Sequence, residues 1–492
     1  MKKDRIEQFQ TTIDQGPYSA SWDSLENYTI PEWFKDAKFG IFIHWGVYSV
    51  PAFGSEWYPR NMYIEGHKVY EHHRQTYGDH AEFGYKDFIP MFKAERFDPA
   101  QWAQLFQKSG AKYVVPVAEH HDGFQMYDSA LSKWNSVQMG PNRDIVGELS
   151  EAIREVGLKF GVSSHRAENW FFYDGGRQFT SDVQSGKWDE LYGPAQPAAP
   201  FWHDLLTGPP SEAFLQNWLA RTAELTSKYS PDLVWFDWWI EHLSFKPYLK
   251  QFWAYYYNLA AQQQKEVVIN YKYEAAPLQT AVLDIERGQL AGTRQLAWQT
   301  DTSIAKNSWS YTENNDFKTT EEIVQALIDI VSKNGNLLLN IGPKADGTIA
   351  KEEEQVLLEI GKWLDIHGEA IFESRPWIIY GEGPNNPQAG SFTDTAHAGF
   401  TSEDVRYTVR DNYLYASVMK WPANGQVRLP LRIVHGSQRN VSIMPAIEQV
   451  ELLGHTGELE WKASEVDGLI VTASNTNDTL NALPRVLKLK IK

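Results

Sequence analysis

The sequence predicts an α/β fold, a (β/α)8-like (TIM) barrel catalytic domain followed by a C-terminal antiparallel β-sandwich. Short apolar runs alternate with amphipathic stretches through about residue 372, as in strand–helix repeats. Several of these runs end on His, Trp or acidic residues, which is typical of the active-site edge of a barrel. Near Arg375-Pro376 the pattern changes to short alternating strands. We therefore place the two domains at residues 1–374 and 375–492.

The barrel strands are predicted from short runs of apolar residues. Their continuous apolar character is typical of parallel strands that are covered on both faces. The predicted strands are 39–44, 113–118, 160–163, 233–236, 267–270 and 337–341. The segment 283–288 shows little regular pattern, and we expect it to be a long loop that leans over the site.

Helices are predicted between or after these strands, where apolar residues recur at helical spacing, at residues 144–156, 212–227, 319–331 and 351–364. In the third stretch, Thr319 and Glu322 form a capping box, and Ile323 and Leu327 recur at helical spacing.

The C-terminal part reads as paired β-strands. The runs 405–409 and 413–418 flank an Asp411-Asn412 turn, and the runs 459–465 and 469–473 flank Asp467-Gly468. Alternating residues around such turns are typical of antiparallel hairpins. This pattern predicts the β-sandwich.

Composition argues against several classes of function. The net charge of −17 disfavours nucleic acids and anionic membrane surfaces, so we expect neither as a partner. The chain has no cysteine, which excludes disulfides, thiol catalysis and zinc–thiolate sites. We see no apolar run long enough to span a membrane and no apolar segment of signal length, and we expect a cytoplasmic protein. The oligomeric state stays open, a homo-oligomer included.

The most informative stretch is Pro231–Trp239, a buried-looking strand that ends on Asp237 among Trp235, Trp238 and Trp239. A carboxylate fixed at a strand end in an apolar surround can attack or stabilise a cationic sugar ring. The alternative is an Asp that caps the following turn.

Other strands also end on polar groups, including His44, the pair His120-His121, and His165. These imidazoles could hydrogen-bond sugar hydroxyls, bind a metal or fix the backbone. The His-Glu-x-x-His spacing of many zinc hydrolases is absent, and neighbouring residues of a strand face opposite sides. We therefore expect no metal.

A retaining glycosidase needs a second carboxyl group, which acts first as acid and then as base. The candidates downstream of Asp237 are Glu274, Asp284, Glu286, Asp301 and Glu313. Glu286, beside Arg287, could equally form a surface ion pair.

Six motifs occur along the chain, namely Gly40-Ile-Phe-Ile-His-Trp-Gly46, Ser55-Glu-Trp-Tyr58, His120-His-Asp-Gly-Phe124, Lys133-Trp-Asn-Ser136, Trp235-Phe-Asp237 and Asn334-Gly-Asn-Leu-Leu-Leu-Asn-Ile-Gly-Pro-Lys-Ala-Asp-Gly347. They resemble, in the same order, those of the α-L-fucosidases of glycoside hydrolase family 29. The resemblance runs from about residue 30 to the end, with a variable C-terminal sandwich.

The resemblance implies a retaining, exo-acting α-L-fucosidase that needs no cofactor and acts on fucosylated oligosaccharides. Asp237 would be the nucleophile. Fucose is a 6-deoxy sugar, so its pocket needs polar groups for three hydroxyls and an apolar wall for the methyl group. The implied substrate-binding residues are His44, Glu56, Trp57, His120, His121 and Trp235, to which we add His165 and Lys272 from the same strand ends.

The chain departs from the family at three places. Ser163-Ser-His165 stands where members usually carry Tyr, and Asn270-Tyr-Lys272 stands for Asn-x-Arg. Gln299 replaces a glutamate that is a candidate acid/base in many members, so we assign that role to Glu286, with Asp301 second. The departures leave two other hypotheses open, a fucose-binding protein that has lost catalysis and a glycosidase for a related sugar such as α-L-galactose.

Overall fold

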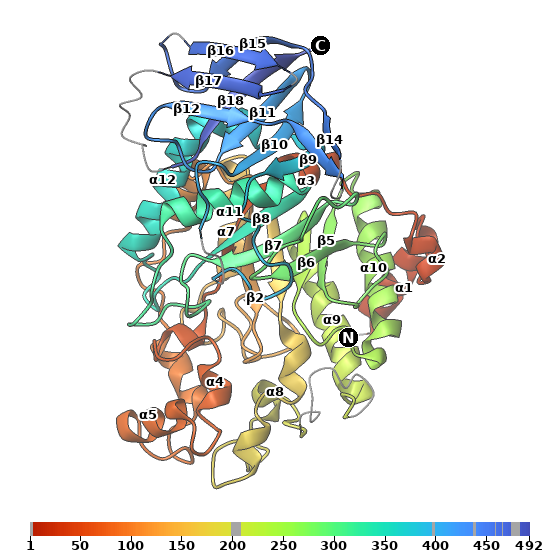
Figure 1. The fold of residues 1–492 in the computed structure, drawn as a ribbon. Coiled ribbons are helices and arrows are strands. Elements are labelled where there is room, and N and C mark those ends of the chain that lie inside the picture. The colour runs from red at the N-terminus through yellow and green to blue at the C-terminus, as the bar shows by residue number, and fades with distance from the viewer. Residues whose placement is uncertain are drawn as a thin grey trace.

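The computed structural model describes residues 3–197, 208–395, 399–435, 439–457, 459–464, 466–473 and 483–492. Eight parallel strands pair in sequence order, and β1 also pairs with β8, so the sheet closes into a barrel (Figure 1). The predicted barrel is confirmed. Its strands are β1 (Phe39–Ile43), β2 (Tyr113–Glu119), β3 (Lys159–Ser164), β4 (Leu233–Phe236), β5 (Val268–Lys272), β6 (Val282–Glu286), β7 (Trp298–Ser303) and β8 (Gly335–Ile341).

Packing inside the barrel explains the glycine in β1. Gly40 lies opposite Tyr113 of β2 and Leu338 of β8. A Cβ atom on Gly40 would lie 2.4 Å from the Tyr113 ring, so only glycine leaves room for that ring. The Tyr113 hydroxyl then donates a hydrogen bond of 2.7 Å to Gln299 in β7, across the barrel interior.

Strands β6 and β7 correct the prediction from the sequence. Residues 283–288 were expected to form a long loop, but Val282–Glu286 is a strand that pairs with β5 and β7. The apolar pattern is weak because these strands carry buried polar groups, among them Asp284, Gln299 and Asp301. Glu286 consequently stands at a strand end, as Asp237 does.

Helices cover the outside of the barrel unevenly. One long helix follows each of β1, β2, β3, β4, β7 and β8, whereas residues 273–281 and 287–297, which connect β5 to β6 and β6 to β7, contain none. The α-helices are α1 (Lys3–Gln15), α2 (Trp22–Leu25), α3 (Glu32–Ala37), α4 (Tyr58–Asn61), α5 (Lys68–Thr76), α6 (Pro99–Lys108), α7 (Ile145–Glu155), α8 (Asp189–Tyr192), α9 (Glu212–Tyr229), α10 (Lys246–Gln262), α11 (Thr320–Ser332) and α12 (Lys351–His367). The 3-10 helices are η1 (Val47–Ser49), η2 (Tyr85–Met91), η3 (Arg166–Trp170), η4 (Asp174–Arg177), η5 (Leu243–Phe245) and η6 (Gly368–Ala370). In the described part of the chain, no helix is both long and apolar enough to cross a bilayer.

The C-terminal strands form antiparallel sheets, as predicted. One sheet has the order β15-β18-β11-β10-β9 and another the order β12-β17-β16, with a separate β13-β14 pair. Apolar side chains of the two larger sheets share one core, for example Tyr407 and Leu487 with Val427 and Val471. The strands are β9 (Arg375–Glu382), β10 (Val405–Arg410), β11 (Tyr413–Val418), β12 (Gln426–Leu429), β13 (Arg432–His435), β14 (Arg439–Ser442), β15 (Ile447–Leu452), β16 (Leu459–Ser464), β17 (Gly468–Ala473) and β18 (Arg485–Ile491).

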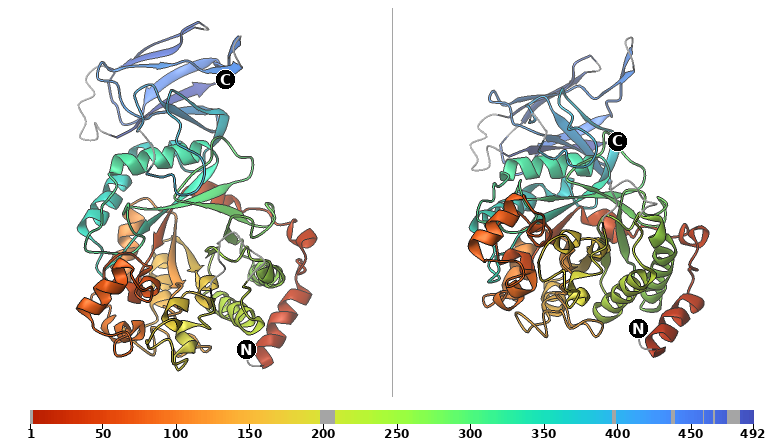
Figure 2. Two further views of the ribbon diagram at one scale, coloured as in Figure 1. Left: turned by 60° about the horizontal axis from the view of Figure 1, so that its bottom comes forward. Right: turned by 90° about the horizontal axis from the view of Figure 1, so that it is seen from below.

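The sandwich lies at one side of the barrel, next to α11, while α1 packs against α10 on another side (Figure 2). A buried ion network joins the two domains. Asp329 of α11 contacts Arg406 of β10 at 2.5 Å and Lys333 at 2.6 Å, and all three side chains have at most 1% exposure. The carboxylate therefore balances two buried cations at the interface.

We expect Asp329→Ala to destabilise the protein by about 3–5 kcal/mol, because it leaves Arg406 and Lys333 buried without their anion. Thermal and urea denaturation measure the loss. The matched control is Asp467→Ala, which removes an exposed pair with Arg428 at 3.6 Å. That change should cost about 0–1 kcal/mol. Equal effects of the two variants would contradict a stabilising role for the interface network.

Candidate active site

The carboxyl ends of the barrel strands surround a pocket of about 210 Å³. Every site residue predicted from the sequence lines this pocket except Lys272. The predicted lining residues are His44, Glu56, Trp57, His120, His121, His165, Trp235, Asp237 and Glu286. Asp301, the second candidate for the acid/base, lines it too, as do Glu168, Trp238, Trp309 and Phe392.

Asp237 follows β4 directly, and two imidazoles hold its carboxylate. His165 Nδ1 lies 2.8 Å from Asp237 Oδ2, and His121 Nε2 lies 3.4 Å from the same oxygen. Burial opposes a charge here, but His165, His121 and the more distant Lys272 outweigh burial and hold the pKa of Asp237 well below its usual value. Asp237 is therefore an anion throughout the physiological pH range.

Three histidines of the pocket, His44, His120 and His121, are neutral hydrogen-bonding groups. Burial holds the pKa of His44 and His120 well below the usual value, and it lowers the pKa of His121 to about 4. His44 Nδ1 lies 2.7 Å from Asn340 Oδ1 in β8, which fixes the ring. His120 Nδ1 is buried and has no hydrogen-bond partner among the described residues, so it is available to a bound ligand.

Two sets of side chains have the proximity of metal ligands. These are His44, His120 and His165, and His121, His165 and Asp237, with each set's ligand atoms within 4.8 Å of one another. His165 belongs to both sets, and its ring nitrogens already contact Asp237 and the Ser163 hydroxyl, the latter at 2.9 Å. An ion would have to replace one of these hydrogen bonds, so the cluster suits polar ligand groups better than a cation.

Glu56 and Trp57 reach the pocket from the segment after β1. The Glu56 carboxylate accepts a hydrogen bond of 3.0 Å from the Trp309 backbone and one of 3.2 Å from the Ser308 hydroxyl. The Trp57 ring lies 5.4 Å from the His121 ring, centroid to centroid. The pocket wall thus combines an anchored carboxylate with an aromatic surface.

Glu286 is the second acid of the pocket, at the end of β6. Trp238 Nε1 donates a hydrogen bond to its Oε2, and Lys272 Nζ lies 3.6 Å from the same oxygen. Burial raises the pKa of Glu286; Lys272 opposes this rise, and the negative charge of Asp237 adds to it. The environment thus favours a proton on Glu286 while it keeps Asp237 ionised.

Lys272 lies beneath the pocket instead of lining it. Its Nζ contacts Asp284 and Asp301, each at 2.7 Å, and its side chain is 1% exposed. Burial disfavours its charge, but these carboxylates outweigh burial and raise the pKa of Lys272 above its usual value. Lys272 was predicted to contact the substrate, whereas the structure surrounds its ammonium group with acids that include Glu286.

Gln299 is also absent from the pocket wall. Its side chain is fully buried, and it donates a hydrogen bond of 2.7 Å to Asp284 and accepts one of the same length from Tyr113. In this chain, position 299 therefore faces the barrel interior. Asp301, two residues later in β7, does line the pocket, and burial together with Asp284 raises its pKa well above the usual value.

The other lining residues differ in how far their place could be predicted from the sequence. Glu168, in η3, belongs to the polar run after β3. Its position shortly after a predicted strand could have identified it as a site residue. Its Oε1 lies 3.8 Å from His121 Nε2, and burial followed by the charge of Asp237 raises its pKa well above the usual value. Trp309, whose ring stacks on His44 at 5.1 Å, and Phe392, from the C-terminal part, follow no predicted strand.

Several known proteins are similar to this chain in sequence and in architecture. A family model described as α-L-fucosidase matches residues 6–369, and one described as the α-L-fucosidase C-terminal domain matches residues 399–491. The tissue α-L-fucosidase of Rattus norvegicus is 33% identical over 463 residues, which cover 92% of this chain and 88% of the rat protein.

Solved structures agree with these matches. The Thermotoga maritima α-fucosidase in complex with a mechanism-based inhibitor is 30% identical, with a TM-score of 0.75, over 96% of this chain and 100% of that one. Its complex with fucose gives 31% identity and a TM-score of 0.73 over the same shares of the two chains. The resemblance inferred from the six motifs is confirmed, and the chain belongs to the α-L-fucosidase family of glycoside hydrolases.

Proposed function

We propose that the protein is a retaining, exo-acting α-L-fucosidase that removes terminal fucose from oligosaccharides or glycoconjugates. The observation that carries the proposal is the pair Asp237 and Glu286. Both acids line one pocket, and their surroundings move their pKa values in opposite directions. An ionised nucleophile beside a protonated acid is the pairing that double displacement requires.

In the first step, Asp237 attacks the anomeric carbon and Glu286 gives its proton to the departing glycosidic oxygen. Both imidazole contacts go to Asp237 Oδ2, so we assign the attack to Oδ1. The product is a covalent fucosyl-enzyme and a free aglycone. In the second step, the Glu286 carboxylate takes a proton from water, the water oxygen bonds to the anomeric carbon, and the bond to Asp237 breaks.

The rest of the pocket fits a single fucose ring. Neutral His44 and His120 with the anchored Glu56 offer hydrogen-bond partners for the hydroxyls, and Trp57 and Trp235 offer apolar surface for the methyl group. A volume of about 210 Å³ is small compared with the roughly 300–1,000 Å³ of many ligand pockets. This size supports exo action on a terminal sugar.

The structure removes the basis for the hypothesis of a catalytically impaired fucose-binding protein. It rested on Gln299 and Lys272, and neither side chain lines the pocket. Two carboxyl groups remain in place for catalysis without a glutamate at position 299. An α-L-galactosidase differs only in the need to admit a hydroxyl at C6, and paired aryl fucoside and aryl α-L-galactoside assays distinguish that activity.

We expect Asp237→Gly to lower kcat on an aryl α-L-fucoside by about 10⁴-fold or more, because no nucleophile remains. Added azide should restore turnover by attack from the vacated side. The product should be the β-configured fucosyl azide, which NMR identifies. Ordinary turnover without azide would refute the assignment.

For the acid/base, Glu286→Ala should keep slow formation of the fucosyl-enzyme from an aryl fucoside with a good leaving group. Azide should then accelerate turnover and yield the α-configured fucosyl azide, because it attacks the covalent intermediate without base catalysis. Asp301→Ala is the matched control in the same pocket. Azide rescue of Asp301→Ala instead of Glu286→Ala would transfer the role to Asp301.

Lys272 lowers the pKa of both Asp237 and Glu286, so its removal should raise both values. Activity requires ionised Asp237 and protonated Glu286. The acidic and alkaline limits of kcat/KM for Lys272→Met should therefore both move to higher pH, as a pH–rate profile on an aryl fucoside will measure.

The control is Lys333→Met, which removes another fully buried lysine from an ion pair, with Asp329 at 2.6 Å. It should cost stability without moving either limit. Unchanged limits in Lys272→Met would show that this lysine does not set the charge of the catalytic acids.

A further inference from the structure

We propose that Trp238, Tyr273 and Phe392 form a platform for the sugar to which fucose is attached. This inference rests on the proposed function and extends it to the leaving-group side. The substrate class that it predicts is a fucosylated oligosaccharide whose next pyranose ring packs an apolar face against aromatic side chains.

The three rings form one group from three separate segments. Trp238 follows β4, Tyr273 follows β5, and Phe392 lies between β9 and β10. The centroid of Trp238 lies 6.0 Å from that of Tyr273 and 6.5 Å from that of Phe392, with an interplanar angle of 16° in the second pair. The Tyr273 ring is tilted by 38° relative to Trp238, so the three rings form a shallow, curved surface that one ligand can contact.

The position of this group is fixed relative to Glu286. Trp238 Nε1 donates a hydrogen bond to the Glu286 carboxylate, and the Phe392 backbone N–H donates one of 2.9 Å to the Glu286 carbonyl oxygen. Glu286 is the group that protonates the glycosidic oxygen in the proposed mechanism. Whatever is bonded to that oxygen must therefore leave along the side of the pocket that Trp238 and Phe392 line.

Exposure and backbone conformation set two of these rings apart. Tyr273 is 51% exposed and Phe392 is 62% exposed, although large aromatic side chains gain most from burial. Both also have a left-handed backbone, with φ of 52° and 59°. Bulky residues rarely adopt this conformation, and such strain tends to persist at ligand-binding sites.

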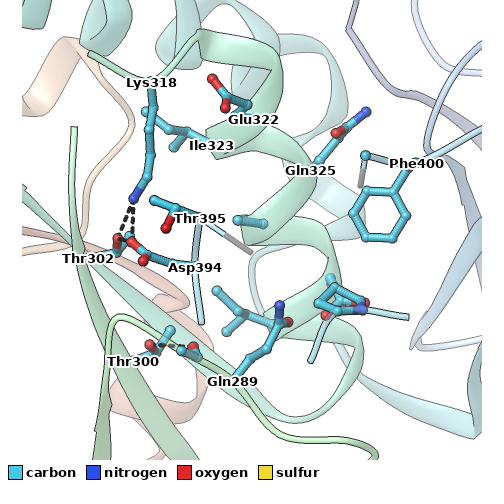
Figure 3. Close-up of a pocket in the computed structure, with 16 residues that line it drawn as sticks. Gln289, Thr300, Thr302, Lys318, Glu322, Ile323, Gln325, Asp394, Thr395 and Phe400 are labelled. Atoms are coloured by element: carbon cyan, nitrogen blue, oxygen red, sulfur yellow. Dashed lines mark hydrogen bonds and ion pairs between the residues drawn. The ribbon is translucent and has the colours of Figure 1, made fainter. Parts of the chain in front are cut away.

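The segment that carries Phe392 is anchored firmly on the barrel. Thr393 N donates a hydrogen bond of 2.8 Å to the Arg287 carbonyl oxygen, and the Asp394 carboxylate contacts Lys318 Nζ at 2.6 Å. Figure 3 shows Lys318 reaching Asp394 and Thr302 in the wall of a cavity beside α11. The backbone at Phe392 is thus already positioned, and a ligand has only the side-chain torsions of the ring to order.

The test compares two substrates that share the fucosyl group. One is α-L-fucosyl fluoride, whose leaving group is too small to reach the rings. The other is a fucosylated oligosaccharide, chosen as the best wild-type substrate among α1-2, α1-3, α1-4 and α1-6 linked compounds. The measured quantity is the ratio of kcat/KM for the oligosaccharide to kcat/KM for the fluoride, which cancels general damage to the catalytic site.

We expect Phe392→Ala and Tyr273→Ala each to lower this ratio by about 3- to 10-fold, mainly through KM, because each removes one stacking surface. Phe392→Trp should retain the wild-type ratio. The matched control is Trp461→Ala, which removes an aromatic side chain with 40% exposure in β16 of the sandwich. That control should leave the ratio unchanged.

An unchanged ratio in both alanine variants would overturn the platform while the proposed function stands. If the wild-type protein hydrolysed neither the fluoride nor any of the oligosaccharides, both the proposed function and the platform would be overturned. Trp238 is left intact in these variants because its hydrogen bond to Glu286 would confound the ratio.

Discussion

The buried ammonium group of Lys272 is the charge on which the catalytic half of the barrel depends. It projects from β5 toward Asp284 and Glu286 of β6 and toward Asp301 of β7, the next two strands of the barrel. Without a cation, three carboxyl groups so close together in a low-dielectric interior would have to take up protons or move apart. Lys272 allows β5, β6 and β7 to close the barrel around acids. From beneath the pocket, its charge also lowers the pKa of Asp237 and of Glu286.

Asp237 and Glu286 acquire opposite properties from different neighbours. Imidazoles surround Asp237 and stabilise its negative charge, whereas Glu286 has an indole N–H and one ammonium group at the longer distance of 3.6 Å. Ionisation of Asp237 itself then disfavours ionisation of Glu286. The proposed division into nucleophile and acid thus arises from the β4 and β6 strand ends, and it needs no difference in the chemistry of the two carboxyl groups.

The sequence predicted most of this arrangement because barrel topology brings strand ends together. Asp237, His44 and the pair His120-His121 follow recognisable apolar runs, so their convergence could be expected. Strands β6 and β7 escaped detection because the ion pairs of Asp284 and Asp301 replace the apolar pattern by which buried strands are found. Phe392 had no local signal at all, since its place depends on how the C-terminal part folds back onto the barrel.

This folding back gives the C-terminal part a role at the site. Most side chains that line the pocket stand at or just after the ends of barrel strands, whose spacing is fixed by the hydrogen-bonded sheet, and Glu56, Trp57, Glu168, Trp309 and Phe392 complete it from connecting segments. The aromatic group around Trp238 instead uses connecting segments and Phe392, which lies outside the barrel. The next two residues, Thr393 and Asp394, bind Arg287 and Lys318. Under the proposals made above, the released sugar contacts mainly residues that follow barrel strands, whereas its neighbour contacts the rim, where Tyr273 and Phe392 lie. Substitutions at that rim would then change which oligosaccharides are cleaved while the charges of Asp237 and Glu286 stay in place.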